Sequence, residues 1–118
     1  MDNTHHGFNY IELGAIDLPA TRAFYEAAFG WVFTEYGSHY AGIRAVDGDG
    51  EVGGLTTTRA PGGNGPLVLL YSDDLDGSVV AVEQAGGTVR SGPYEFPGGR
   101  RFTFTDPSGN ELGVWSES

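Results

Sequence analysis

Two segments of the chain have the hydrophobic pattern of amphipathic helices. The first is DLPATRAFYEAAFG at 17–30, where apolar residues recur at helical spacing between an Asp and a Gly. The second is DLDGSVVAVEQAGG at 74–87, with the same features. Asp17 and Asp74 are suited to cap a helix N-terminus, and the closing glycines are suited to end one. Both segments are therefore predicted to be helices.

Short apolar or alternating runs surround each helix and predict β-strands. One run precedes each helix and three follow it. The runs are FNYIEL at 8–13, WVFTEY at 31–36, HYAGIRAV at 39–46 and EVGGLTTT at 51–58 in the first half, and LVLLY at 67–71, TVRSG at 88–92, RRFTFT at 100–105 and ELGVW at 111–115 in the second. The order strand, helix, strand, strand, strand therefore occurs twice.

An internal duplication accounts for this repetition. An offset of 57 residues superposes the two helical segments with five identities in 14 positions. Repeated supersecondary units of this kind determine the whole fold. We therefore expect a single domain over residues 1–118, with module one at 7–59, a Pro- and Gly-rich linker at 60–66 and module two at 67–116.

Three stretches carry a family resemblance: NYIELGAIDLPATRAFYEAAFGW at 9–31, SDDLDGSVVAVEQAGGTV at 72–89 and TDPSGNELGVW at 105–115. With them the chain resembles the vicinal oxygen chelate superfamily, which includes glyoxalase I, the extradiol dioxygenases and the bleomycin-resistance proteins, and is most similar to its small glyoxalase-like group. The resemblance implies an α+β fold of two βαβββ modules that form a curved mixed sheet around a cup, and it implies a homodimer. It does not specify the reaction, because this scaffold supports many chemistries.

Metal-dependent members of the superfamily carry one ligand, usually His, Gln or Glu, on the first and the last strand of each module. The resemblance transfers these positions to Tyr10, Gly54, Leu67 and Gly113. A divalent metal needs three or four nitrogen or oxygen donors that converge on one point. These four residues include no good ligand, so we expect no metal and no cofactor.

A different register would leave a weaker metal site. Strand alternation places Glu12 on the face of Tyr10 and Glu111 on the face of Gly113. A slip of two residues would bring both carboxylates toward the cup, where they could hold Mg²⁺ or Mn²⁺ without an imidazole ligand. The three histidines are interpreted as loop or surface residues.

The same alternation predicts which side chains line the cup. Ile11 and Leu13 would face the helices, and the residues between and before them would face the concavity. Glycines at two inner positions would leave room, and a concave apolar surface with a few polar groups suits a small molecule. The expected ligand-binding residues are Tyr10, Glu12, Leu67, Leu69, Tyr71, Phe102, Phe104 and Trp115.

Glu12 is the candidate for chemistry in this cup. It could act as a general base or anchor a cationic ligand. Alternatively, it forms a structural ion pair with Arg44 or Arg101, or reaches solvent at the rim. The sequence therefore leaves open whether the protein is an enzyme.

The composition of the chain limits which binding partners and which location are expected. The net charge is −10 and all six basic residues are Arg, so nucleic acid is not expected as a partner, because phosphate binding needs a basic surface. There is no cysteine, no apolar run as long as a membrane span and no visible secretory signal, so the cytoplasm is the default location.

Two functions are favoured by these features, and a third, a small accessory subunit that acts through its dimer surface, is compatible with them. The first is a glyoxalase-like protein without a competent metal site that binds and sequesters an aromatic or cationic small molecule. The second is a glyoxalase-like lyase or isomerase that uses Glu12 as its base.

Overall fold

The computed structural model describes residues 3–6 and 8–118, which contain both predicted helices and all eight predicted strands. Gly7, where we place the start of module one, lies outside the described residues. The elements are β1 Ile11–Gly14, α1 Leu18–Phe29, β2 Phe33–Glu35, β3 Tyr40–Arg44, β4 Glu51–Thr56, β5 Val68–Tyr71, α2 Leu75–Gln84, β6 Thr88–Phe96, β7 Gly99–Thr105 and β8 Glu111–Ser116.

The predicted helix caps are confirmed. The Asp17 carboxylate accepts a hydrogen bond from the Ala20 amide at 3.0 Å, and the Asp74 carboxylate accepts one from the Gly77 amide at 3.1 Å. Gly30 ends α1 in the left-handed conformation, with φ 69°. Each cap satisfies backbone groups that have no partner inside the helix.

Two strand boundaries differ from the prediction. The first strand begins at Ile11 rather than at residue 8, and Phe8 is fully exposed. β1 is an edge strand whose pairing with β4 starts at Ile11 opposite Gly53. β6 extends to Phe96, beyond the predicted 88–92, because its hairpin with β7 supplies partners along that length.

The strands form two four-stranded sheets. Sheet A has the order β1-β4-β3-β2, and sheet B has the order β5-β8-β7-β6. In each sheet the first strand of the module pairs in parallel with the last, and the other pairs are antiparallel. The two βαβββ modules with mixed sheets confirm the predicted fold. The two sheets are not closed into one within the described chain.

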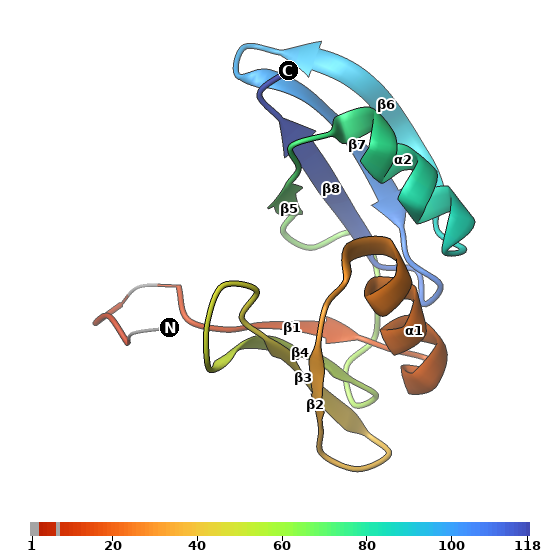
Figure 1. The fold of residues 1–118 in the computed structure, drawn as a ribbon. Helices are drawn as coiled ribbons and strands as arrows, with labels where there is room; N and C mark the ends of the chain where they lie inside the picture. The colour runs from red at the N-terminus through yellow and green to blue at the C-terminus, as the bar shows by residue number, and fades with distance from the viewer. Residues whose placement is uncertain (1–2, 7) are drawn as a thin grey trace.

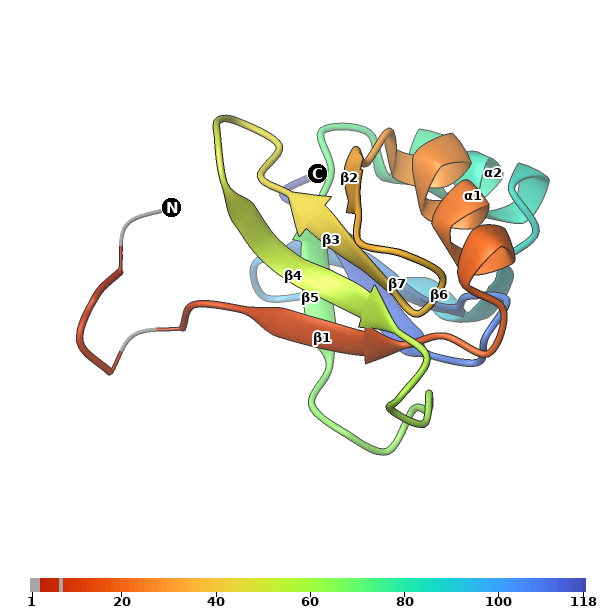
Figure 2. The same cartoon turned by 90° about the horizontal axis from the view of Figure 1, so that it is seen from below.

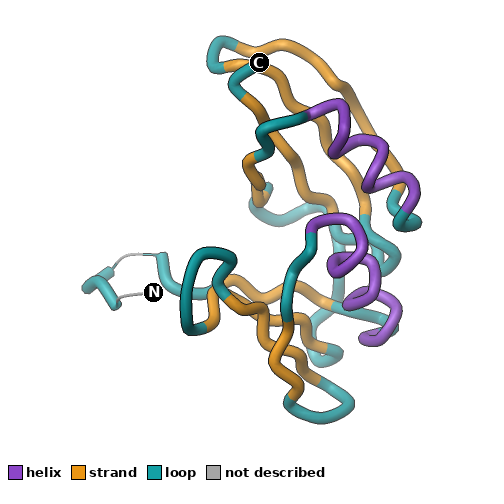
Figure 3. Tube along the Cα trace, in the orientation of Figure 1, coloured by secondary structure: helices purple, strands orange, loops and turns teal. Residues whose placement is uncertain are grey.

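Both helices lie on the same side of the two sheets. α1 packs on β3 and β4, α2 packs on β6, β7 and β8, and the helices contact each other. Figures 1 and 2 show the two helices side by side. Figure 3 shows the two sheets extending in different directions from this pair of helices. No helix among the described residues is long and apolar enough to span a membrane.

A single core joins the modules between the helices and the sheets. Phe24 of α1 lies 5.9 Å, centroid to centroid, from Phe104 of β7. Both rings are buried. The helix-covered face of each sheet is therefore occupied, and the opposite face, here called the open face, is covered by neither helix.

Candidate functional site

The open face of sheet A carries a cluster of tyrosines and glutamates. Its members, here called the tyrosine–glutamate cluster, are Tyr10, Glu12, Tyr36, Tyr40 and Glu51. The Tyr40 hydroxyl donates to Glu12 Oε2 at 3.0 Å and lies 2.6 Å from the Tyr10 hydroxyl. The Tyr10 hydroxyl lies 3.3 Å from Glu51 Oε2, and the Tyr36 hydroxyl donates to Glu51 Oε1. A continuous hydrogen-bonded chain thus links the two carboxylates.

The phenols of this cluster remain protonated over an ordinary pH range. Burial raises the pKa of Tyr40 well above its usual value, and hydrogen bonds with Tyr10 and Glu12 raise it further. The pKa of Tyr10 is also raised, chiefly by burial. Tyr40 can therefore donate a hydrogen bond to Glu12 or to a bound oxygen, but it cannot serve as a base near neutral pH.

Glycines make room for the cluster. A Cβ at Gly54 would overlap the Tyr40 hydroxyl, and a Cβ at Gly42 would lie 2.5 Å from the Glu51 carboxylate. Gly54, Gly42 and Glu12 are cross-strand neighbours. The space that the sequence predicted for a ligand beside Gly54 is thus occupied by Tyr40.

Sequence reasoning missed Tyr36, Tyr40 and Glu51. Alternation places Tyr40 and Gly42 on one face of their strand, but only the pairing register shows that this face is shared with Glu12. An ion pair of Glu12 with Arg44 or Arg101, one of the alternatives that the sequence left open, is not present in the described part of the chain. Arg44 instead donates to Thr34, and Arg101 donates to Tyr94.

The open face of sheet B is aromatic and apolar. Leu67, Leu69 and Tyr71 are exposed, and Tyr71 packs edge-on against Trp115 at 5.0 Å between ring centroids. The Tyr71 hydroxyl donates to Glu117. Four of the predicted ligand-binding residues are therefore together on one surface, while Tyr10 and Glu12 lie on the other sheet.

Phe102 and Phe104 do not belong to either open face. Both are fully buried in the core, and their cross-strand partners are Val114 and Leu112. Cross-strand partners share one face of a sheet. Because Leu112 and Val114 face the helices, the two phenylalanines also face the helices. Their neighbours Arg101 and Thr103 point to the open face instead.

The positions transferred from metal-dependent relatives do not fit a metal ion. Tyr40 fills the space beside Gly54, and the Leu69 side chain lies over Gly113, 2.5 Å from where a Cβ would be. Among the described residues, no group of three or more His, Cys, Asp or Glu side chains is arranged to hold a metal. Glu111, the carboxylate of the alternative register, lies beside Gly63 in the connection between the modules.

A buried polar network ties the turn at 106–110 to module one. The Asp106 carboxylate accepts hydrogen bonds from Tyr25, from the amides of Ser108 and Asn110, and from the Asn110 side chain. Asn110 also donates to the Gly14 carbonyl at 2.7 Å. Burial, with the adjacent Asp106 charge, raises the pKa of Tyr25 well above its usual value. This network is structural, because buried polar groups need such partners.

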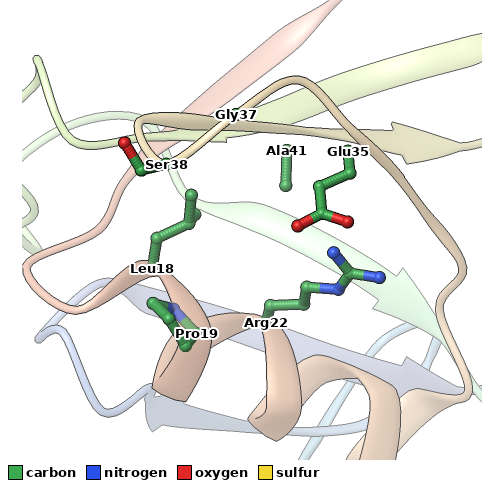
Figure 4. Close-up of a pocket in the computed structure, with 7 residues that line it drawn as sticks. All are labelled: Leu18, Pro19, Arg22, Glu35, Gly37, Ser38 and Ala41. Atoms are coloured by element: carbon green, nitrogen blue, oxygen red, sulfur yellow. The ribbon is translucent and has the colours of Figure 1, made fainter.

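A separate pocket lies on the helix side of sheet A, as Figure 4 shows. It has a volume of about 360 Å³ and is bounded by the start of α1 and by the β2–β3 hairpin. Leu18 of α1 and Ala41 of β3 give it apolar lining from opposite sides, and the charged ends of Arg22 and Glu35 point toward one another. None of the predicted ligand-binding residues lines it.

Comparison with known proteins agrees with this architecture. Residues 7–114 match the sequence profile of the Glyoxalase/Bleomycin resistance protein/Dioxygenase superfamily. The chain belongs to this superfamily. Its structure is similar to a glyoxalase-related enzyme from Fulvimarina pelagi, with a TM-score of 0.80 at 18% identity over 94% of this chain and 88% of that one.

Two other proteins to which the chain is similar have names that bear on small molecules. TnmS3, an antibiotic binding protein from Streptomyces sp. CB03234, has a TM-score of 0.70 at 24% identity and covers 95% of this chain and 96% of its own. The anthracycline biosynthesis protein DnrV of Streptomyces peucetius is 31% identical over 124 residues, which cover 90% of this chain and 45% of DnrV. The chain spans about half the length of the curated relatives it matches.

Proposed function

We propose that this protein binds an aromatic or cationic small molecule on the open faces of its sheets, without a metal ion, and thereby sequesters it. The observation that carries the proposal is the uncovered aromatic surface of sheet B, where Leu69 is 41% and Tyr71 is 51% exposed beside Trp115. Contiguous exposed apolar side chains on a folded domain mark a binding surface. The names of TnmS3 and DnrV support a natural product as the ligand.

Metal-independent binding is favoured by the chemistry of the open faces. The side chains at the transferred ligand positions offer no convergent donors, and the two carboxylates of the tyrosine–glutamate cluster are already engaged by phenols. Sequestration needs affinity but no activated group. Elemental analysis of protein purified without chelators or affinity metals tests this part, and a transition metal near one equivalent per chain would contradict it.

Tryptophan fluorescence can test ligand binding at the proposed surface. Trp115 is on the open face, whereas Trp31 is partly buried and stacks on the core residue Tyr25, with 4.4 Å between the ring centroids. Trp31→Phe therefore leaves a single reporter at the site. Titration of this variant with a panel of planar aromatic and cationic aromatic compounds should quench or shift the Trp115 emission. No change across the whole panel, checked by calorimetry on the unmodified protein, would count against a binding role.

An isomerase or lyase is the second candidate, because Glu12 is exposed and has a phenol as its neighbour. The Glu12 carboxylate could accept a proton from a bound substrate while Tyr40 donates a hydrogen bond to the developing charge. Glu12→Gln keeps the shape of the side chain and removes its basicity. Turnover of a glyoxalase-type substrate by the unmodified protein, lost in this variant with folding intact, would establish the enzyme.

A homodimer is part of the proposal. Each open face belongs to one module only, and the described chain has no strand pairing between sheets A and B that would join the two faces. A second copy could supply the missing wall of each face. Sedimentation at micromolar concentration should give about twice the mass of one chain, and a monomer at all concentrations would remove this part of the proposal.

A further inference from the structure

Four side chains form a row across the open face of sheet B. Tyr71 of β5 is the register partner of Trp115 of β8, Trp115 is the partner of Arg101 of β7, and Arg101 is the partner of Tyr94 of β6. Directly opposed residues on one face of a sheet are close enough for their side chains to interact. A single cation thus lies within an aromatic row.

The aromatic neighbours hold the Arg101 guanidinium in place. Its Nε donates to the Tyr94 hydroxyl at 2.6 Å. Its Cζ lies 5.4 Å from the centroid of the Tyr94 ring and 5.7 Å from that of Phe96. Contacts of a guanidinium with ring faces at this range are attractive. They restrict the side chain without neutralising its charge.

The two terminal nitrogens of Arg101 remain available. An Arg side chain has five N–H donors, and only the one on Nε has an acceptor in residues 3–6 and 8–118. The two salt bridges of those residues use Arg22 and Arg100 instead. A rigid fork of unused donors matches a carboxylate, or two adjacent oxygen atoms, in a bidentate arrangement.

The net charge of the protein further restricts which kind of ligand can bind at Arg101. At a net charge of −10, the protein repels small anions as a whole, so an oxyanion alone would bind weakly. A ligand that also covers Trp115 would gain apolar contact area in addition to the bidentate hydrogen bonds. Because Trp115 and Arg101 are cross-strand partners, one planar molecule can reach both.

We propose that Arg101 is the specificity-determining residue of this face and that the ligand is a planar aromatic compound with a carboxylate, or with adjacent hydroxyl and carbonyl oxygens, at its edge. This inference rests on the proposed binding function, which names an aromatic or a cationic ligand, and it favours an aromatic ligand with an anionic or oxygen-bearing edge over a cationic one. In this arrangement the ring stacks on Trp115 and the oxygens accept hydrogen bonds from the terminal nitrogens of Arg101.

Calorimetric titration with two naphthalene probes tests the inference. 1-Hydroxy-2-naphthoate carries the adjacent oxygens, and 1-naphthylmethylamine carries an ammonium group on a ring system of the same size. The unmodified protein should bind the naphthoate at least about tenfold more tightly, since a charge-assisted bidentate contact is made only with this probe. A preference for the amine would overturn the inference.

Variants of the protein show whether Arg101 is responsible for the tighter binding of the naphthoate. Arg101→Gln should weaken naphthoate binding about tenfold, and Arg101→Lys should weaken it by less, because a charge without the planar fork remains. Arg100→Gln is the matched control, since Arg100 is the preceding residue on β7 but bonds to Asp76 on α2, and it should leave the affinity unchanged. Tyr94→Phe, which removes only the acceptor of Nε, should cost about threefold through looser positioning.

The outcomes separate this inference from the proposed function. Equal naphthoate affinity in the unmodified protein and in folded Arg101→Gln would overturn the role of Arg101 but leave aromatic binding intact. If Arg101→Gln does not fold, as judged by circular dichroism, Arg101→Lys and Tyr94→Phe decide in its place, and unchanged affinity in both overturns the role. Absence of any response across the full aromatic panel would instead contradict the proposed function itself.

Discussion

The two modules have the same order of elements but present different open faces. Sheet A carries a hydrogen-bonded chain of phenols and carboxylates, whereas sheet B carries leucines, an edge-on Tyr71–Trp115 pair and Arg101. The helix-covered faces are mainly apolar in both modules and form the common core. The comparison shows that the duplicated fold constrains only the side chains that pack under the helices, so the open faces are free to differ in chemistry.

The turns that precede the last strand of each module differ as strongly. The first, at 47–50, is exposed. The equivalent turn at 106–110 has a buried Asp106, Ser108 and Asn110 that bond across to module one. One repeat therefore supplies the polar contacts that join the two modules.

The largest expected difference in stability is between the variants Asp106→Ala and Asp47→Ala, one in each turn. Loss of the Asp106 carboxylate leaves four buried donors without their acceptor, so the free energy of unfolding should fall by about 3 kcal/mol or more. Asp47 is exposed, and its substitution should leave the urea midpoint unchanged. Urea unfolding followed by circular dichroism measures both. An equal loss of stability in the two variants would contradict the conclusion that only the turn at 106–110 supplies stabilising polar contacts.

Alanine substitution of the glycines at equivalent positions of β4 and β8 should give a smaller difference in stability. Gly54→Ala pushes Tyr40 away from Glu12 and breaks a hydrogen bond, which should lower the free energy of unfolding by about 1–2 kcal/mol. Gly113→Ala meets mainly the flexible end of Leu69, so it should cost about half as much. Spectrophotometric titration should also show that the Tyr40 phenol ionises more easily in Gly54→Ala, because its hydrogen bond with Glu12 is lost. An unchanged titration would contradict the placement of Tyr40.

Alkaline pH should reveal the buried phenol of the inter-module network. The pKa of Tyr25 is raised in the folded protein, whereas in the unfolded chain it is about 10. The stabilising contribution is thus complete below pH 10 and is lost as pH rises toward the folded value, since the unfolded state releases its proton first. Tyr25→Phe should flatten the decline in stability above pH 10. The control Tyr94→Phe removes an exposed phenol that lies outside this network, so a slope reduced equally by both would contradict the assignment.

The smallest change in stability is expected for Tyr71→Ala on the open face of sheet B. Tyr71 is half exposed, and its edge-on contact with Trp115 should contribute about 1 kcal/mol or less. In a Trp31→Phe background the emission of Trp115 should move to longer wavelength, because its ring becomes more hydrated. An unchanged spectrum would show that Trp115 is not packed on Tyr71.

Local patterns were sufficient to predict the elements but not the site. Asp17, Gly30 and Asp74 act through neighbours in sequence, so the helix ends could be inferred directly. Phe102 and Phe104, which were predicted to line the ligand site, are buried in the core, because their register with Val114 and Leu112 turns them away from the open face. Tyr40 was missed for the same reason, since its partners lie 30 and 28 residues away.

The sequence by itself determined the duplicated order of strands and helices and the apolar face that each module buries, because both follow from short-range periodicity. Only the tertiary structure decided that Tyr40 fills the space beside Gly54, that Asp106 joins the modules and that Arg101 lies between aromatic rings. These arrangements depend on which strands are neighbours and in what register. Register is set by the packing of the whole domain, which no local segment encodes.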